Sequence, residues 1–351
     1  MLKVHTWVPQ GSILGPLFYT LFTNELPEVI HDHLVQQGPG DRPQPGEQDW
    51  PAYHMSGENG TICCYADDTT FTSNDPDPAV LSTKLTNKYN IIAQFMVNNR
   101  LKLNDDKTHL LVMTTGQARS AVQAGVQVRI VTATETIRPT SSEKLLGCWV
   151  HENLKWAEHL RDNTDNIIKS LNTRLGALKK VRKLTTFKNR KMIAEGIFTS
   201  KLSYLAALWG GCGAGLKKSL QLIQNKVARV VTRLDWATPA RELLRQCGWL
   251  SVNQLIFYHS VLLIHKVKQN RTPKYLHSMH NSWSYQYKTR QAESGLIQLM
   301  GRPRLELCKD SFRWRGASQY NQLPAEIRNC ETEANFKLKA KTWIKLNISL
   351  N

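Results

Sequence analysis

The sequence predicts an α+β fold for the first part of the chain, with an antiparallel sheet and helices, and an all-α fold for the rest. Two patterns lead to this prediction. Up to about residue 157, short stretches rich in β-branched, aromatic and cysteine residues flank one segment with helical periodicity. Beyond it, apolar residues recur at three- and four-residue steps. We therefore expect three regions, 1–157, 158–235 and 236–351, the last being a small helical C-terminal module.

The totals limit what the protein can be. Its 351 residues are 41% hydrophobic, enough for two or three domains with a sizeable core. The formal net charge of +18 favours a polyanionic partner, either a nucleic acid or an acidic membrane surface. No apolar stretch is long enough to span a bilayer, and we expect no membrane partner. The seven cysteines lack C-x-x-C spacing, which favours free thiols in a reducing compartment.

The chain opens with a turn followed by a helix. Pro9 and Gly11 mark the turn, and Ser12 is suited to cap a helix that continues to about Leu26. Because Gly11 has no side chain, the pair Gln10-Gly11 would let a ligand approach the backbone closely.

Residues 31–60 are predicted to form a loop-like insertion, because Gly, Pro, Gln and Asp are frequent there and no periodicity is present. His31, His33 and His54 lie in this insertion, just before Cys63 and Cys64. The spacings match no standard zinc site, so we expect histidines on a surface loop rather than a zinc centre.

The pair Asp67-Asp68 stands out among the acidic residues. It follows the apolar run 61–64 and Tyr65-Ala66, and Thr69-Thr70-Phe71 comes next, so we expect two short strands joined by a tight turn at the aspartates. Adjacent carboxylates repel, and burial raises their pKa unless a cation lies beside them. Mg²⁺ and Mn²⁺ prefer such oxygen ligands. The alternative is an ordinary turn, in which Asp is a common residue.

The remaining elements of the first region follow from the spacing of apolar residues. A helix is expected over 79–100, and strands over 109–113, 126–131 and 145–150. Lys107 lies between this helix and the first of these strands.

The region from 158 onward is predicted to be helical and strongly basic. Helices are expected over 186–209 and 216–233, separated by the glycine-rich residues 210–213. Between residues 161 and 233 there are 16 Lys and Arg against 3 Asp and Glu. A charge run often marks only a solvated face, but an imbalance this large favours contact with phosphates. The residues expected to contact a nucleic-acid backbone are Lys169, Arg174, Lys179, Lys180, Arg182 and Lys183.

The last region is expected to be helical as well. A helical pair over 236–270 precedes a polar stretch and a linker at 301–304, and a short helical end-module follows. Several tryptophans are expected in the core, with stacking platforms for nucleic-acid bases as the alternative. They are Trp209, Trp236, Trp249 and Trp314.

The order of these segments resembles that of reverse transcriptases from non-LTR (LINE-type) retrotransposons. Tyr65-Ala66-Asp67-Asp68 alone is weakly specific, whereas four segments in the family's order, over most of residues 8–235, are strongly specific. They are similar to the segment before the palm helix, the catalytic box, the next motif and the primer grip. In this chain they are Val8 to Pro16, Tyr65 to Asp68, Leu101 to Asn104 with Lys107-Thr108, and Lys144 to Gly147 with Trp156 and His159.

The resemblance implies a partial polymerase palm over 1–157, a helical thumb over 158–235, and RNA-directed DNA synthesis with two Mg²⁺ or Mn²⁺ ions. It also implies an RNA template, a DNA primer and deoxynucleoside triphosphates as partners, and a nuclear or cytoplasmic, intracellular location. The resemblance leaves any protein partner unknown. The residues and roles it implies are Asp67 and Asp68 as catalytic metal ligands, Lys107 near the leaving phosphate, Gln10, Gly11, Tyr65 and Ala66 at the nucleotide and template, and Leu145, Leu146 and Gly147 at the primer end.

The chain departs from the family's pattern at its start. The family carries a further essential Asp upstream of the segment that matches residues 8–16, whereas no acidic residue precedes Glu25 here. We therefore expect an N-terminally truncated reverse transcriptase, inactive alone because the upstream catalytic strand and the fingers are missing. The alternatives are a non-catalytic basic module that binds nucleic acid, and a fragment that aggregates through an unpaired strand edge instead of folding.

Overall fold

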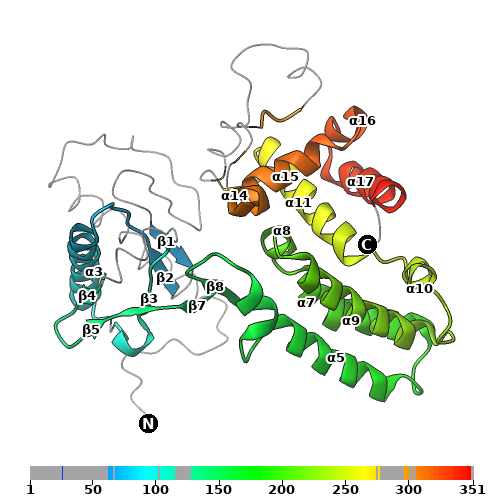
Figure 1. The fold of residues 1–351 in the computed structure, drawn as a ribbon, viewed down its shortest axis with the longest axis horizontal. Coiled ribbons are helices and arrows are strands. Elements are labelled where there is room, and N and C mark those ends of the chain that lie inside the picture. Colours follow the sequence, from blue (N-terminus) through cyan, green and yellow to red (C-terminus); the bar gives the residue numbers. More distant parts are fainter. Residues whose placement is uncertain are drawn as a thin grey trace, which may run out of the picture. The chain divides into compact units, whose positions relative to one another are not determined.

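The structure is a computed structural model that describes residues 26, 62–65, 68–101, 103–114, 128–273, 276, 296–299, 303 and 306–348. Residue contacts divide the chain into two units, Met1–Ser141 and Ser142–Asn351 (Figure 1). The sequence predicted a first boundary at residue 157, which lies after the division at Ser141. The identification of the expected regions as palm, thumb and end-module stays a prediction. The predicted opening helix and the insertion at 31–60 lie outside the described residues, apart from the buried Leu26.

The first unit contains the predicted hairpin around the aspartates. Strands β1 (Ile62–Tyr65) and β2 (Asp68–Phe71) pair antiparallel, with Ile62 opposite Phe71 and Tyr65 opposite Asp68. Helix α3 (Pro78–Asn98) follows and confirms the helix predicted over 79–100. Asp77 caps α3, because its side chain accepts from the Ala79 amide at 2.8 Å, and Pro78 suits the first turn. One buried cluster joins the hairpin to the helix: Leu26, Ile62, Ile92, Phe95 and Met96.

The other strands of this unit are short and form separate pairs within the described residues. Strand β3 (Leu110–Leu111) pairs parallel with β6 (Pro139–Thr140), and β4 (Ile130–Val131) pairs antiparallel with β5 (Thr136–Ile137). A 3₁₀ turn, η1 (Asp105–Lys107), precedes β3. The combination of helix and small sheets confirms the α+β class. The expected antiparallel arrangement is wrong for β3 and β6, because their chains run in the same direction.

The second unit begins with a hairpin where a single strand over 145–150 was expected. Strands β7 (Ser142–Leu145) and β8 (Cys148–His151) pair antiparallel around Leu146-Gly147. Both turn residues have positive φ, 48° at Leu146 and 78° at Gly147. Two-residue hairpin turns commonly need this backbone conformation at both positions. The single-strand prediction is therefore wrong, because the chain reverses in the middle of its apolar run.

Helices make up the rest of the second unit. The predicted helix over 216–233 is confirmed, as is the pair over 236–270, but the one over 186–209 is interrupted. In chain order the elements are η2 (Glu158–Asp162), α5 (Ile167–Val181), α6 (Phe187–Ala194), η3 (Glu195–Thr199), α7 (Ser200–Ser203), α8 (Ala206–Trp209), α9 (Ala214–Thr232), α10 (Ala240–Cys247), α11 (Val252–Lys268), α14 (Glu306–Asp310), α15 (Phe312–Asn321), α16 (Ala325–Arg328) and α17 (Glu333–Asn347).

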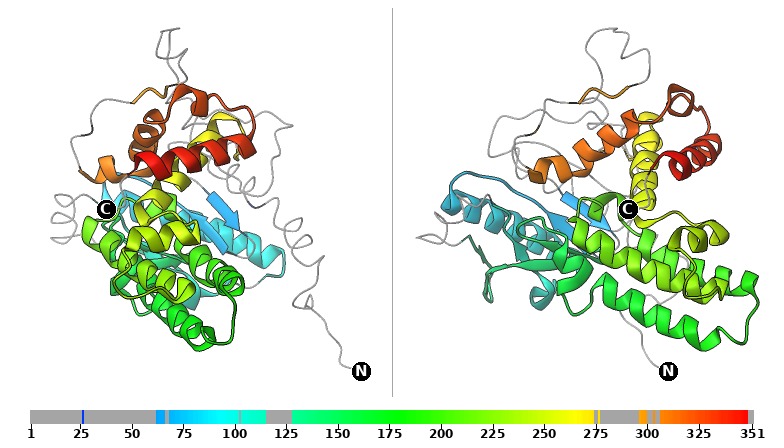
Figure 2. Two further views of the ribbon diagram at one scale, coloured as in Figure 1. Left: turned by 90° about the vertical axis from the view of Figure 1, so that its right-hand side faces the viewer. Right: turned by 45° about the vertical axis from the view of Figure 1, so that its right-hand side comes forward.

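These helices share one hydrophobic core. Helix α11 contacts α8, α9, α15 and α17 and lies among them (Figures 1 and 2). The side chain of Gln254 on α11 donates to the Ile348 carbonyl at 2.9 Å, which fastens the end of the chain to the bundle. Fully buried side chains come from both halves of the unit: Leu171, Phe198, Leu220, Ile264, Tyr320 and Phe336.

The break after α8 depends on two glycines. A Cβ on Gly210 would lie 2.3 Å from Ile256 Cγ2, and a Cβ on Gly211 would lie 2.3 Å from the Asp310 carbonyl oxygen. Both distances are far inside van der Waals contact. Only glycine therefore lets this turn pack so closely against α11 and α14.

Two predictions about the whole chain can be compared with the structure. All seven cysteines are free thiols, as the spacing indicated. Within the described residues no single helix is long and apolar enough to cross a membrane, although α10 and α11, bent by 44°, meet that test as a pair.

Candidate catalytic hairpin and nucleic-acid interface

The β1–β2 hairpin holds Asp68 at the end where its two strands are joined, opposite Tyr65. Tyr65 and Asp68 face each other in the register, and both are exposed, Tyr65 to 60%. Ala66 and Asp67 join them in the sequence and lie outside the described residues, as do Gln10 and Gly11. Because alternate side chains of a strand face opposite sides, burial of Ile62 against α3 fixes the hairpin while Asp68 stays accessible.

The residues at this hairpin fit one side of a divalent-metal site. The Asp68 carboxylate is a hard oxygen donor, and Asp67 adjoins it in the sequence. Among the described residues, however, no three His, Cys, Asp or Glu side chains lie close enough together to hold a metal ion. The described part of the chain therefore offers a ligand for Mg²⁺ or Mn²⁺ without completing a site.

Lys107 is exposed beside an anchored carboxylate that the sequence did not single out. The Tyr89 hydroxyl on α3 donates to one oxygen of Asp105, and Thr134 Oγ1 donates to the other at 2.8 Å. These bonds fix η1, so Lys107 projects from a held turn. Burial, followed by the bond to Asp105, raises the pKa of Tyr89. A buried tyrosine needs a partner for its hydroxyl, which is the signal that could have pointed to Asp105.

Leu145, Leu146 and Gly147, the residues predicted at the primer end, form the end of β7 and the turn to β8. The side chains of Leu145 and Leu146 are each 41% exposed at the tip of the hairpin. Tyr204 donates from its hydroxyl to the Leu146 carbonyl at 2.7 Å. A Cβ added to Gly147 would lie 3.9 Å from Tyr204 Cε1. An aromatic side chain from a distant part of the sequence therefore supports the turn.

The break in the predicted 186–209 helix places Tyr204 against this turn. Tyr204 is extended, with φ −60° and ψ 123°, and Leu205 has a φ of 54°. The buried Trp209 donates from Nε1 to the Tyr204 carbonyl at 2.9 Å. This bond satisfies a carbonyl that has no partner within the helix, because the helix ends there. The path from Trp209 through Tyr204 to Leu146 was not foreseen, because nothing local in the sequence indicates it.

His159 contacts the same hairpin through strand β8. It is 1% exposed, and its Nδ1 accepts from the Trp149 amide at 3.3 Å. Its ring meets Trp156 edge-on with centroids 6.4 Å apart. Burial, followed by the charges of Lys201 and Lys144, lowers the pKa of His159 to about 4. His159 is therefore neutral at pH 7 and holds β8 through its acceptor nitrogen.

The predicted backbone-contacting residues lie on α5 and the turn after it. The four lysines, Lys169, Lys179, Lys180 and Lys183, are exposed, while Arg174 and Arg182 are half-buried. Arg174 donates back to Ser170 on its own helix. Lys169, Lys179 and Lys180 lie on the exposed part of α5, whose buried positions are Ile167, Leu171, Leu175 and Leu178, while Lys183 lies on the turn after the helix.

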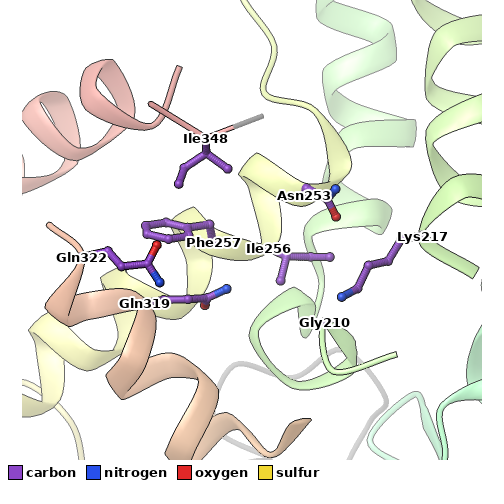
Figure 3. Close-up of a pocket in the computed structure, with 8 residues that line it drawn as sticks. All are labelled: Gly210, Lys217, Asn253, Ile256, Phe257, Gln319, Gln322 and Ile348. Atoms are coloured by element: carbon purple, nitrogen blue, oxygen red, sulfur yellow. The ribbon is translucent and has the colours of Figure 1, made fainter. Parts of the chain in front are cut away.

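A pocket of about 270 Å³ lies between helices of the second unit (Figure 3). Its walls combine apolar Ile256 and Phe257 with Lys217 and three side-chain amides, those of Asn253, Gln319 and Gln322. None of its lining residues is a carboxylate, a histidine or a cysteine. Lys217 is therefore the ionisable side chain among the residues that line this pocket.

Comparison with known proteins shows what the segment that contains the hairpin is similar to. Residues 2–150 match the family model described as "Reverse transcriptase (RNA-dependent DNA polymerase)". The matched segment contains both the Asp68 hairpin and the tip of the β7–β8 hairpin. Residues 2–150 are thus similar to the reverse transcriptase family.

Relatives narrow the class to the LINE-type enzymes of non-LTR retrotransposons. Three proteins of Drosophila melanogaster are similar: "Probable RNA-directed DNA polymerase from transposon BS" (25% identical), the one "from transposon X-element" (22%) and "RNA-directed DNA polymerase from mobile element jockey" (21%). The alignments cover 72%, 77% and 68% of this chain, and 25%, 26% and 23% of those proteins, respectively. The chain therefore spans about a quarter of their length. No solved structure matches the chain significantly.

Proposed function

We propose that this chain is the part of a retrotransposon RNA-directed DNA polymerase that runs from the catalytic hairpin to the thumb, and that it binds an RNA template with a DNA primer. One observation carries the proposal. Within the segment that matches the family, an exposed aspartate, Asp68, begins the second strand of a two-stranded hairpin. The opposite face of this hairpin packs in a buried core. That arrangement makes a carboxylate accessible to a substrate and holds it in place.

The residues of the hairpin take roles that fit their exposure. Asp67 and Asp68 would hold the divalent ions, Mg²⁺ or Mn²⁺. When bound, such ions activate the primer hydroxyl and offset the charge of the leaving pyrophosphate. Lys107 would neutralise or protonate that leaving group, because it is exposed on a turn that Asp105 fixes. Tyr65, 60% exposed opposite Asp68, would contact the incoming deoxynucleoside triphosphate, together with Ala66, Gln10 and Gly11.

The second unit would hold the primer and the duplex. The exposed Leu145 and Leu146 at a fixed turn would position the primer end through apolar contact with its last sugar and base. The lysines of α5 would bind phosphates.

We further propose that the 351-residue chain does not polymerise by itself. Carboxylates from two strands complete a two-metal site, and no acidic residue precedes Glu25 in this sequence. Primer extension by the purified chain with Mg²⁺ or Mn²⁺ should stay at background. Robust extension that Asp67→Asn abolishes would overturn this proposal and establish an active enzyme.

A second candidate function, a basic module that binds nucleic acid without catalysis, is favoured by the exposed lysines of α5 on a core-bearing helical unit. Binding to a template–primer should weaken steeply with salt, because each neutralised phosphate releases counterions. Replacing both Lys179 and Lys180 by Gln should reduce the log–log salt slope by about 2. The matched control replaces Lys339 and Lys341, exposed on α17, and should leave the slope unchanged. A salt-independent affinity would exclude this function.

A further inference from the structure

Trp236 differs from the other tryptophans that were expected in the core. Trp209 and Trp249 are 1% and 8% exposed, which confirms the prediction for them. Trp236 is 83% exposed, so the prediction is wrong for this residue. An indole is the largest apolar side chain, and leaving it in water forgoes the free energy of its burial. A single exposed apolar side chain marks no site by itself, so the surroundings of the indole decide its role.

Contacts with Arg229 fix the position of the Trp236 indole. The Arg229 guanidinium lies over its ring at 5.0 Å from the centroid. Arg229 Nη2 also donates to the carbonyls of Trp236 and Thr238, at 3.1 and 2.9 Å. Asp235 closes the turn, accepting from the Ala237 amide at 2.8 Å. A cation therefore covers part of one face of a positioned ring that is otherwise open to solvent.

Positive charge gathers at the same end of the helical unit. Arg233, just after α9, donates to the Arg182 carbonyl, which ties the ends of α5 and α9 together (Figure 1). Arg233 and Lys183 are exposed there, beside the half-buried Arg182. The acidic residue of the Trp236 turn, Asp235, already uses a carboxylate oxygen to bind a backbone amide. A polyanion would thus meet more cations than anions at this end of the unit.

An open, positioned indole among cations matches the chemistry of an unpaired nucleotide. Bases present a flat π-face that stacks on tryptophan whatever the sequence, while arginine and lysine take the phosphates. A base-paired end offers less of that face, because each base already stacks on its neighbour. An apolar protein segment would gain nothing from the surrounding cations.

We propose that Trp236 is a stacking platform for an unpaired base of a single-stranded nucleic acid, whose flanking phosphates lie along Arg182, Lys183 and Arg233. The proposal rests on the proposed nucleic-acid-binding function and adds a second contact, separate from the α5 lysines and from the Asp68 hairpin. It assigns to the loop after α9 the capture of template or primer sequence that is not base-paired.

The experiment uses the full chain and a single-stranded oligonucleotide that carries 2-aminopurine, a fluorescent base quenched by stacking. The unmodified chain should quench the probe. Trp236→Ala should abolish the quenching and weaken single-strand affinity roughly 10- to 100-fold, as the loss of one base stack predicts. Trp236→Phe should keep the affinity within about threefold, because phenylalanine retains a π-face. Affinity for a blunt duplex of the same sequence should be the same for all three proteins.

Leu184→Ala is the matched control, because Leu184 is 84% exposed on the turn after α5 and has no aromatic ring. It should change neither affinity nor quenching. Equal losses for Leu184→Ala and Trp236→Ala would indicate a general apolar docking surface and overturn the stacking proposal. Unchanged single-strand binding by Trp236→Ala, with salt-dependent duplex binding retained, would refute the platform and leave the proposed function standing. Absence of binding to both single strands and duplexes would instead overturn the nucleic-acid-binding function itself.

Discussion

The two units of this protein differ in how they are stabilised. In the first, the β1–β2 hairpin and the short strand pairs contact α3 through two small buried clusters. In the second, one continuous core involves helices from α5 to α17. The polymerase chemistry is thus proposed for the unit with the smaller cores, and nucleic-acid binding for the unit with the larger one. Small cores position a site only with help from their neighbours, whereas a large core holds a binding surface unaided.

The two units also bury different titratable side chains. In the first unit Lys88 is 4% exposed and donates from Nζ to the Thr72 carbonyl at 2.9 Å. Burial, followed by the charge of Lys84, lowers its pKa to about 8. The second unit buries Arg190, which is 4% exposed, and two histidines, His159 and His265, each 1% exposed. A lysine of this kind responds to alkali and a histidine to acid, so pH distinguishes the two units.

The largest effect is expected in the helical core. Leu220 on α9 is fully buried, and Leu220→Ala should lower the free energy of unfolding by about 3–5 kcal/mol, through lost burial and the cavity left behind. Denaturation followed by the helical circular dichroism signal measures it. Leu222→Ala is the control, because Leu222 is 52% exposed on the same helix and should cost less than about 0.5 kcal/mol. Equal effects of the two substitutions would show that α9 does not pack as described.

Acid should weaken the second unit by a smaller amount at each of two buried histidines. Burial lowers the pKa of His159 and of His265 to about 4, so the folded state resists a proton that the unfolded chain binds near pH 6.5. Stability therefore falls as pH drops from about 6.5 to 4, by up to about 3 kcal/mol for each histidine, and is flat above pH 7. Unfolding free energies measured between pH 8 and 4 test the slope.

His265→Phe separates the two histidines. His265 stacks on Phe336 with centroids 3.9 Å apart, and both of its ring nitrogens are buried without a hydrogen-bond partner in the described part of the chain. Phenylalanine can occupy that stack and cannot titrate, so the acid-induced loss should fall by about half. An unchanged acid slope would show that His265 has the same pKa in the folded and the unfolded chain.

Sequence patterns predicted those elements whose causes are local. Helices α3 and α9 were found almost to the residue, since their apolar positions repeat with the helical period. The interruption at Tyr204-Leu205 and the turn at Leu146-Gly147 were missed for another reason. Both need positive φ at a leucine, which only tertiary contacts such as the Trp209 bond make tolerable.

The residues of the candidate site also fall into two groups, those that a local motif predicts and those that it does not. Asp68, Lys107 and Leu145 were predicted as site residues because their residue types recur in a family's order, and their roles stay predictions. Tyr89 with Asp105, and Tyr204 with Leu146, join positions far apart in the sequence, and no local pattern encodes such pairs. Trp236 was predicted wrongly because composition does not distinguish a core tryptophan from an exposed one. The roles of Asp67, Ala66, Gln10 and Gly11 stay predictions, since these residues lie outside the described ranges.

A moderate effect is expected at the turn that β7 and β8 share. Gly147 has a φ of 78°, so Gly147→Ala should destabilise the hairpin by about 1–2 kcal/mol. Gly176→Ala is the opposite case, because Gly176 lies within α5 with open space at its Cβ. That change should stabilise α5 by about 0.5–1 kcal/mol. Thermal unfolding of both variants measures the pair. Destabilisation by Gly176→Ala as well would mean that glycine removal harms the fold generally rather than at the turn.

The smallest effect concerns the bond between the helical core and the same turn. Tyr204→Phe removes a hydroxyl that donates to the Leu146 carbonyl at 2.7 Å, and should cost about 1 kcal/mol. Hydrogen exchange should accelerate in the amides of β7 and β8 while those of α9 keep their protection, because the core does not depend on this bond. Tyr258→Phe is the control, since no partner for the Tyr258 hydroxyl is found within the described residues. If exchange in the hairpin were unchanged, the turn would hold its shape without the core. The large core would then stabilise the binding surface of α5 without positioning the primer end.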